Sequence, residues 1–230
     1  MGDKPIIFSA PMVRALLDRR KSQTRRVLKP QPTLPWGSAS HAGQSWWTHD
    51  SLTGDVIETW RLPYAVGDRL YVREQCATWG RGPEVEPVEF PVVYAADDPE
   101  WDDIKHDARN SKTGDEWKIR PSIHMPRWAS RLTLTVTDVR VQRLQEISDA
   151  DAWAEGCKQG DPWDSSEGFF PAEEPSPDGK GIVGWDCARD WYADLWNSLH
   201  GPDAWDANPW VVALSFTVQR GNIDQIGGDA

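Results

Sequence analysis

One segment, residues 131–144, constrains the fold more than any other part of the chain. Leu132, Leu134 and Val136 alternate with threonines, and two valines continue the pattern past a bend expected at Asp138. Alternation with a period of two is typical of a β-strand that buries one of its faces. The segment therefore predicts the longest strand of the fold.

Further strands and helices are indicated by shorter patterns. Strands are expected at four places: residues 5–8, 69–73, 90–95 and 211–218. Helices are expected at three: after Pro11, at residues 149–155 behind an N-cap at Ser148, and at residues 185–199 before Gly201. Strands of mixed spacing with a few short flanking helices predict an α+β fold with a mixed β-barrel.

The length of 230 residues suits one domain, which we assign to residues 1–220. Segments rich in Gly, Pro, Ser and acidic residues interrupt the patterned parts and are interpreted as loop insertions. They lie at about residues 31–63, where a hairpin is expected around Gly54, 95–117 and 158–183. Residues 221–230 are expected to form a flexible tail.

Several classes of protein are excluded or disfavoured by simple counts. The longest apolar stretches are too short to span a bilayer, and the first residues carry no signal-peptide pattern. Cys76, Cys157 and Cys187 are widely spaced, which favours reduced thiols of a cytoplasmic protein over disulfides or a zinc site. We expect no metal and no cofactor.

The net charge of -11 disfavours nucleic acid as a partner, but the charge is unevenly distributed. Residues 1–30 hold eight lysines and arginines against two aspartates, and residues 118–143 hold six against one. Residues 148–206 hold fourteen acidic residues against three basic ones. If the two basic segments line the same cleft, a polyanion can bind there despite the overall sign; the alternative is that the charges are scattered over solvated faces.

The most distinctive motif is Arg-Arg-Lys-Ser-Gln-Thr-Arg-Arg at residues 19–26. Like-charge crowding lowers the pKa of a partly buried lysine, so Lys21 is a candidate base that activates the Thr24 hydroxyl. The neighbouring cations and hydroxyl are candidate contacts to substrate or phosphate: Arg20, Ser22, Arg25 and Arg26. A solvated basic loop after a helix is the alternative.

This motif resembles the Gly-Arg-Lys-Thr-x-Thr-x-Arg signature of the ASCH domain, a member of the PUA-like superfamily. Gly67 to Glu74 is similar to the Gly-Asp-x-Leu-x-Val strand of that family, and residues 120–128 resemble a longer, phage- and prophage-encoded branch. The resemblance covers about 130 residues and implies a PUA-like β-barrel. The Gly before Arg-Lys is Arg19 here, and the first Thr is Ser22.

One branch of the family consists of amidohydrolases that deacetylate N4-acetylcytidine, with a lysine base, a threonine nucleophile and a glutamate proton donor. The resemblance implies Lys21, Thr24 and Glu155 for these roles. Glu74 is a competing carboxylate, whose alternative interpretation is a strand-end charge paired with an arginine.

Residues 120–128 form a second candidate site, in which His124 lies between two prolines. His124 and Arg127 are candidate ligand contacts, although a lone histidine is more often structural. Trp128 is a candidate for stacking on an unpaired base, as are Trp46, Trp47 and Trp79. Most of the fifteen tryptophans, among them Trp191, Trp196 and Trp210, are expected to pack in the core.

Three functions remain open. The first is binding of RNA, single-stranded nucleic acid or a modified nucleoside through the basic cleft. The second is an enzyme, either an amidohydrolase of N4-acylated cytidine or a ribonuclease. The third is a regulatory interaction in which the acidic segment 148–206 faces a protein partner.

Overall fold

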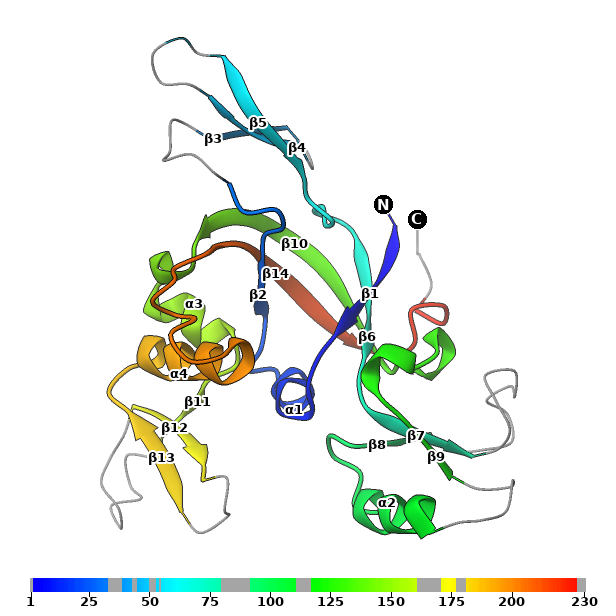
Figure 1. Cartoon of the computed structure of the whole chain (residues 1–230). Coiled ribbons are helices and arrows are strands. Elements are labelled where there is room, and N and C mark those ends of the chain that lie inside the picture. The colour runs from blue at the N-terminus through cyan, green and yellow to red at the C-terminus, as the bar shows by residue number, and fades with distance from the viewer. Residues whose placement is uncertain are drawn as a thin grey trace. The chain divides into compact units, whose positions relative to one another are not determined.

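The structure is a computed structural model that describes residues 2–32, 39–42, 45–49, 53, 55–79, 92–110, 117–160, 171–176 and 181–226. Strands predominate and helices are few, which confirms the expected mixed α+β class (Figure 1). The chain forms two compact units. Unit 1 comprises Met1–Arg19, Asp68–Thr135 and Thr217–Ala230, and unit 2 comprises Arg20–Gly67 and Val136–Phe216.

The largest sheet has the strand order β1-β6-β10-β14-β2. Its strands are β1 (Asp3–Ile7), β6 (Arg69–Arg73), β10 (Leu132–Arg143), β14 (Trp210–Arg220) and β2 (Gln23–Val27). β1 runs parallel to β6, whereas β10 is antiparallel to β6 and β14 is antiparallel to β2. The long strand predicted at residues 131–144 is confirmed, and β10 and β14 contribute residues to both units. Among the described residues, these five strands do not close into a barrel.

Unit 1 contains a small sheet on either side of the insertion predicted at about 95–117. Its strands are β7 (Cys76–Trp79), β8 (Val92–Tyr94) and β9 (Trp117–Arg120), in the order β8-β7-β9. Strand β8 matches the strand predicted at 90–95. The prediction of a loop at 95–117 is wrong for α2 (Trp101–Asn110), whose Ile104 is buried against Ala77 and Val93. Trp101 packs against the same cluster, so the apolar face of this short acidic helix is held by the sheet.

The other elements of unit 1 flank β1 and β6. Helix α1 (Ala10–Leu17) has Pro11 in its first turn, as predicted, and buries Val13, Ala15 and Leu16. Two short 3₁₀ helices, η1 (Ser122–His124) and η2 (Arg127–Ala129), precede β10. The expected flexible tail is wrong for residues 221–226, because Asn222 and Ile223 are buried; residues 227–230 lie outside the described residues.

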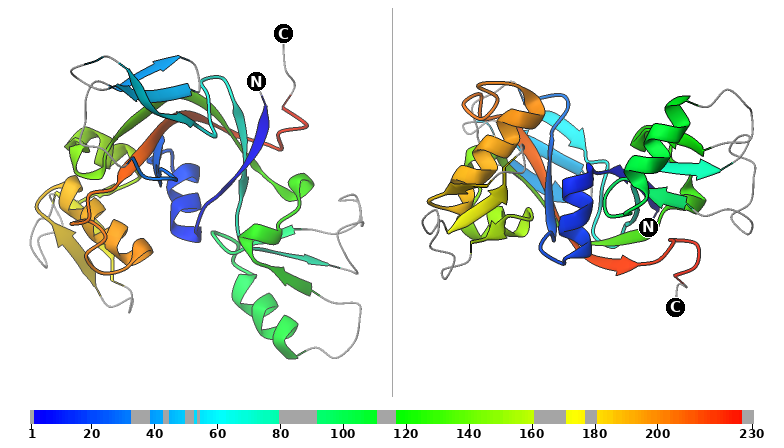
Figure 2. Two further views of the ribbon diagram at one scale, coloured as in Figure 1. Left: turned by 45° about the horizontal axis from the view of Figure 1, so that its top comes forward. Right: turned by 90° about the horizontal axis from the view of Figure 1, so that it is seen from below.

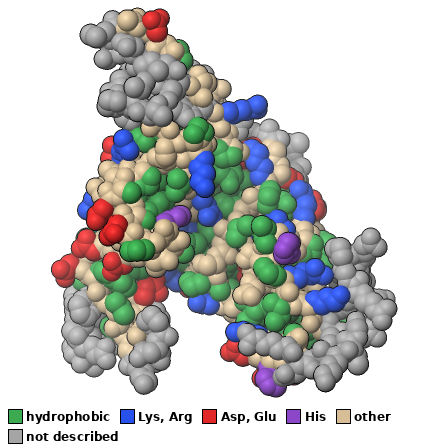
Figure 3. All heavy atoms as spheres, in the orientation of Figure 1, with side chains coloured by type: hydrophobic (Ala, Val, Ile, Leu, Met, Phe, Trp, Pro, Cys, Tyr) green, Lys and Arg blue, Asp and Glu red, His purple; other side chains and the backbone are tan. Residues whose placement is uncertain are grey.

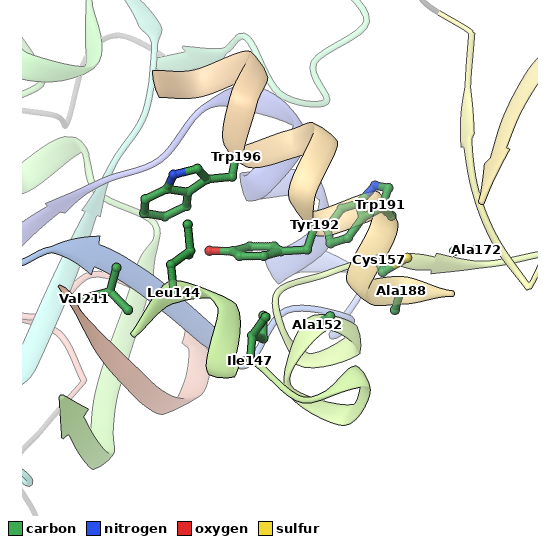
Figure 4. Close-up of a cluster of buried hydrophobic side chains, with 10 residues drawn as sticks. All are labelled: Leu144, Ile147, Ala152, Cys157, Ala172, Ala188, Trp191, Tyr192, Trp196 and Val211. Carbon is green, nitrogen blue, oxygen red and sulfur yellow. The ribbon is translucent and has the colours of Figure 1, made fainter. Parts of the chain in front are cut away.

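Unit 2 is built around two helices that pack against each other; they are labelled in Figure 1, and Figure 2 shows two further views. Helix α3 (Asp149–Ala154) follows the 3₁₀ helix η3 (Leu144–Glu146), and Ser148 caps it by accepting a hydrogen bond from the Asp151 amide, as predicted. Helix α4 (Ala188–His200) ends at Gly201, where φ is 103°. Figure 4 shows Tyr192 of α4 between Trp191 and Trp196, facing Leu144 and Val211.

Two further small sheets belong to unit 2. The loop insertion predicted at 158–183 contains β11 (Lys158–Gln159), β12 (Ala172–Pro175) and β13 (Ile182–Trp185), so that prediction is wrong for these strands. The hairpin predicted around Gly54 is confirmed by β4 (Ser45–His49) and β5 (Val56–Arg61), which pair antiparallel beside β3 (Ala39–Ala42).

Candidate functional site

The motif at residues 19–26 lies in unit 2 from Arg20 onward, against the end of α3. Lys21 forms an isolated antiparallel bridge with Glu155, and the Ser22 amide donates to the carbonyl of Ala154 over 2.8 Å. The chain then enters β2, which pairs with β14 from Gln23 to Val27. Backbone pairing on both sides therefore fixes where the side chains of the motif point.

Lys21 and Glu155 form a buried ion pair. Nζ of Lys21 is 2.7 Å from Oε2 of Glu155 and donates a second hydrogen bond to the Glu155 carbonyl over 2.8 Å. The Lys21 side chain is 0% exposed and that of Glu155 is 3% exposed. Of the three residues that the ASCH resemblance implies for catalysis, these two are in direct contact.

Arg25 extends this pair into a network. Its Nη1 lies 2.9 Å from Oε1 of Glu155, and its Nη2 lies 3.0 Å from Oδ2 of Asp151. Gln23 donates to Oδ1 of Asp151 over 2.8 Å, and Arg140 lies 3.1 Å from the same oxygen. Two buried cations thus face two carboxylates, which is the arrangement that makes burial of charge tolerable.

Burial is the main cause that lowers the pKa of Lys21, and the charge of Glu155 opposes that shift. The charges of Arg26 and Arg25 lower the pKa of Lys21 further, so the like-charge crowding expected from the sequence contributes less than burial. Burial also raises the pKa of Tyr192 well above its usual value, and the Glu155 charge and a hydrogen bond with Glu155 act in the same direction. The phenol of Tyr192, a residue of α4, is therefore neutral and lies beside the network.

Thr24 lies on the other face of β2. Side chains of neighbouring strand residues point to opposite faces, so Thr24 points away from the side that Gln23 and Arg25 share. Its cross-strand partner is Leu214, which belongs to a hydrophobic cluster with Leu28 and Val212. Thr24 is 3% exposed. The structure thus joins Lys21 to Glu155 and places Thr24 beside a separate apolar cluster.

The remaining residues of the motif lie nearer the surface of unit 2. Ser22 is exposed, whereas Arg20 and Arg26 are half-buried, and Arg20 donates from Nη1 to the Gly156 carbonyl. The motif is therefore neither a fully solvated loop nor a fully open cleft. Lys21 and Arg25 are enclosed, and the residues around them reach solvent to different degrees.

One candidate residue was missed by the sequence analysis. His200, the last residue of α4, is exposed, and its ring lies against that of Trp196 with centroids 4.2 Å apart and the planes tilted by 36°. Partial burial of the imidazole is the main cause that lowers the pKa of His200, and the charges of Arg26 and Lys29 lower it further. We call His200, Arg26 and Lys29 the His200 surface. A histidine directly before a helix-ending Gly-Pro pair is the only sequence signal for it.

Glu74 belongs to unit 1, where it is 1% exposed. Its two carboxylate oxygens lie 2.9 and 3.0 Å from Nε and Nη2 of Arg131, whose guanidinium also lies 3.9 Å above the Tyr94 ring. Burial raises the pKa of Glu74 although the Arg131 hydrogen bond lowers it. The geometry matches the second interpretation of Glu74, a strand-end carboxylate paired with an arginine.

The second candidate segment also belongs to unit 1. His124 in η1 is exposed and Trp128 in η2 is half-buried. Arg127 is held by Asp224 and Asp3, at 2.6 and 2.5 Å from Nη2. Of these three predicted contact residues, Arg127 is already paired with carboxylates, and His124 is the one most open to solvent.

The other predicted tryptophans have mixed outcomes. The rings of Trp79 and Trp117 meet edge to face with centroids 5.5 Å apart, so Trp79 has a protein partner. The side chains of Trp46 and Trp47 lie outside the described residues. Trp191, Trp196 and Trp210 are 2–6% exposed, which confirms their expected place in the core. The single cleft lined by both basic segments stays a prediction.

In Figure 3 acidic side chains gather over the part of unit 2 that holds α3 and α4. All three cysteines are free thiols, and Cys76 and Cys157 are buried.

Within the described ranges, no three His, Cys, Asp or Glu side chains form a group that could hold a metal ion. None of the helices in the described part of the chain has the length and apolar character needed to cross a membrane.

Comparisons with known proteins give no match: no family model, curated protein or solved structure matches this chain.

Proposed function

We propose that this chain is an ASCH-type protein with a PUA-like barrel, which binds a nucleobase or single-stranded nucleic acid. The observation that carries the proposal is the His200 surface. The exposed ring of His200, supported from one side by the buried Trp196 at 4.2 Å, lies within the electrostatic influence of Arg26 and Lys29. Aromatic rings that stack on bases, flanked by cations that contact phosphates, are the usual combination in single-strand binding.

The electrostatics of the His200 surface also support this function. A lowered pKa keeps the His200 imidazole neutral at pH 7, so the ring stacks on a base without a charge that must be desolvated. Arg26 and Lys29 supply the attraction to phosphate. Lys21 and Arg25 are buried and paired with Glu155 and Asp151, and act as the internal support of the motif.

Fluorescence anisotropy with labelled single-stranded RNA and DNA tests the proposal. We expect affinity to fall steeply between about 50 and 300 mM salt. His200→Ala should weaken binding by about 5- to 100-fold, which corresponds to the loss of one stacked base. Lys29→Gln should reduce the salt dependence by one phosphate contact.

Matched controls exist in the same chain. His106→Ala removes another histidine, with a side chain that is 78% exposed, and Lys158→Gln removes a cation that is paired with Glu173. Both variants should bind like the unaltered protein. Absent or salt-independent binding by the unaltered protein would remove this function.

A second candidate function is hydrolysis of the amide of N4-acylated cytidine, and the contact between Lys21 and Glu155 favours it. Amide hydrolysis needs a base for the nucleophile and an acid for the leaving amine. A lysine with a lowered pKa and a carboxylate 2.7 Å away are able to share these proton transfers. The family resemblance assigns the nucleophile to Thr24, although that side chain lies on the opposite face of β2 from Arg25.

Incubation with N4-acetylcytidine and detection of cytidine by mass tests this alternative. Thr24→Val should abolish turnover, whereas Thr24→Ser should retain part of it. Lys21→Met should also be inactive, and circular dichroism must verify that this variant folds, because Lys21 is fully buried. Undetectable hydrolysis by the unaltered protein excludes the amidohydrolase.

A further inference from the structure

The C-terminal residues 221–226 form a tight turn that is anchored to the body of unit 1. The Gly221 amide donates to the Arg131 carbonyl over 2.8 Å, and Ile223 is 1% exposed. Nδ2 of Asn222 lies 2.8–3.0 Å from the carbonyl oxygens of Arg127, Trp128 and Ser130. Residues 221–223 therefore hold the turn in place by burial and backbone hydrogen bonds.

The turn presents Asp224 to the guanidinium of Arg127. Nε of Arg127 lies 2.9 Å from Oδ2 of Asp224, and Nη2 lies 2.6 Å from Oδ1, which is a two-pronged contact. Asp3 accepts a further hydrogen bond from Nη2 over 2.5 Å. The hydrogen bond from Arg127 lowers the pKa of Asp224, so this carboxylate is ionised at neutral pH.

This ion pair lies at the surface. The side chain of Arg127 is 36% exposed and that of Asp224 is 57% exposed. An exposed pair contributes little net stability, since water and salt compete for both partners. The turn is already held by Asn222 and Ile223, so Asp224 adds little to its attachment. The Asp224 carboxylate is therefore available for a role other than attachment of the turn.

A carboxylate held by two guanidinium nitrogens has the same hydrogen-bonding pattern as a phosphate held by arginine. The Tyr71 ring, 5.3 Å from the Arg127 guanidinium, also fixes its position. If Asp224 moves away, Nε of this oriented guanidinium becomes able to donate to an external anion, while Asp3 still holds Nη2.

We propose that Arg127 is a phosphate-binding residue, and that in the unbound protein the Asp224 carboxylate takes the place of the phosphate. The C-terminal turn is then an intramolecular competitor of a phosphate group, and binding requires exchange of one anion for the other. This inference rests on the proposed nucleic-acid-binding function, because it takes a strand phosphate as the ligand. Free phosphate or a mononucleotide has the same chemistry and is separated by the test.

The test compares the unaltered protein with Asp224→Asn, Arg127→Gln and the double variant, using a labelled single-stranded oligonucleotide. Asp224→Asn keeps the shape of the side chain but removes the competing charge, and we expect about 3- to 10-fold tighter binding with a steeper salt dependence. The double variant should lose this gain. Asp103→Asn removes an exposed acid of α2 in the same unit and reports the general effect of one charge.

The outcomes separate the two ideas. If the unaltered protein binds the strand and Asp224→Asn binds no more tightly than Asp103→Asn, the inference on Arg127 is overturned while the proposed function stands. If no variant binds the strand, inorganic phosphate is titrated at constant ionic strength. Stabilisation of Asp224→Asn alone, measured by thermal shift, then identifies free phosphate as the ligand source, and its absence overturns both ideas.

Discussion

Nζ of Lys21 lies 2.7 Å from Oε2 of Glu155, and the other oxygen of that carboxylate accepts a hydrogen bond from Arg25. The two residues are 134 positions apart in the chain. One carboxylate thus serves two buried cations of the same basic motif. This arrangement gives Lys21 a structural role whatever its chemical role, and it defines the first prediction.

Glu155→Gln should destabilise the protein strongly. The change leaves Lys21 and Arg25 with Asp151 as the remaining carboxylate of the buried network. Removal of one partner from a buried ion pair costs about 3–5 kcal/mol of unfolding free energy. Urea denaturation followed by tryptophan fluorescence measures the loss.

Two further variants make the Glu155 result specific. Adding Lys21→Met to Glu155→Gln should recover part of the loss, because it removes the unmatched cation. Asp206→Asn, at an exposed acid of unit 2, should change the unfolding free energy by less than about 0.5 kcal/mol. Equal effects of Glu155→Gln and Asp206→Asn would contradict a buried network.

The unfolding free energy should fall at alkaline pH because of two buried thiols. Burial raises the pKa of Cys76 from 9.0 to about 11 and that of Cys157 from 9.0 to about 12. In the unfolded chain both ionise near pH 9, so their contribution is complete below pH 9 and is lost as the pH rises towards 11 and 12. Each thiol contributes a slope of up to about 1.4 kcal/mol per pH unit.

Urea unfolding under reducing conditions at pH 8.5 and 10.5 measures this loss. A Cys76→Ala, Cys157→Ala variant should lose less stability over the same range. At pH 8, a thiol reagent should modify the half-buried Cys187 first and the other two cysteines only on unfolding. Equal pH dependence of the variant and the unaltered protein would mean that the thiols do not contribute.

Asn222→Ala should destabilise unit 1 although it lies close to the end of the chain. The Asn222 amide nitrogen is within hydrogen-bonding distance of three backbone carbonyls around η2, and the side chain is buried. Loss of a buried donor leaves its acceptors unsatisfied and costs about 1–3 kcal/mol. Limited proteolysis and urea unfolding detect the loss, and Gln225→Ala, at an exposed neighbour, is the control. A silent Asn222→Ala variant would indicate a flexible tail.

Gly201→Ala should cost about 1–3 kcal/mol through backbone strain alone. Gly201 ends α4 with φ of 103° and ψ of 165°, a conformation that is essentially restricted to glycine. A Cβ added there meets no heavy atom within 4 Å, so no steric clash contributes. Thermal unfolding measures the effect. Gly2→Ala is the control, because its Cβ would only reach ordinary contact with Lys4, and the two variants should differ clearly.

The sequence predicted the elements that rest on local signals. The alternation in β10, the proline at the start of α1, the Ser148 cap of α3 and the glycine that ends α4 all appear as expected. Each of these signals acts within a few residues, so no tertiary contact is needed to recognise it.

Elements that depend on distant partners were not predictable in the same way. The strands β7 and β9 pair with each other although a long segment separates them in the sequence, and α2 packs on their sheet through Ile104. The face of β2 on which Thr24 lies follows from register with β14, whose residues are almost 190 positions away. A one-residue shift of that register would exchange the two faces.

The sequence by itself therefore determined the α+β class, the long strand, the cap of α3, the glycine that ends α4 and the motif from which a candidate site is drawn. It placed the start of α4 at residue 185, however, which lies in β13. Only the tertiary structure decided that Lys21 and Arg25 share Glu155 and that Thr24 lies on the other face of β2 from Arg25. The ion pair between Arg127 and Asp224 also depends on the tertiary structure. The reason is physical. Local backbone preferences act over a few residues, whereas burial and charge pairing depend on which distant segments the fold brings into contact.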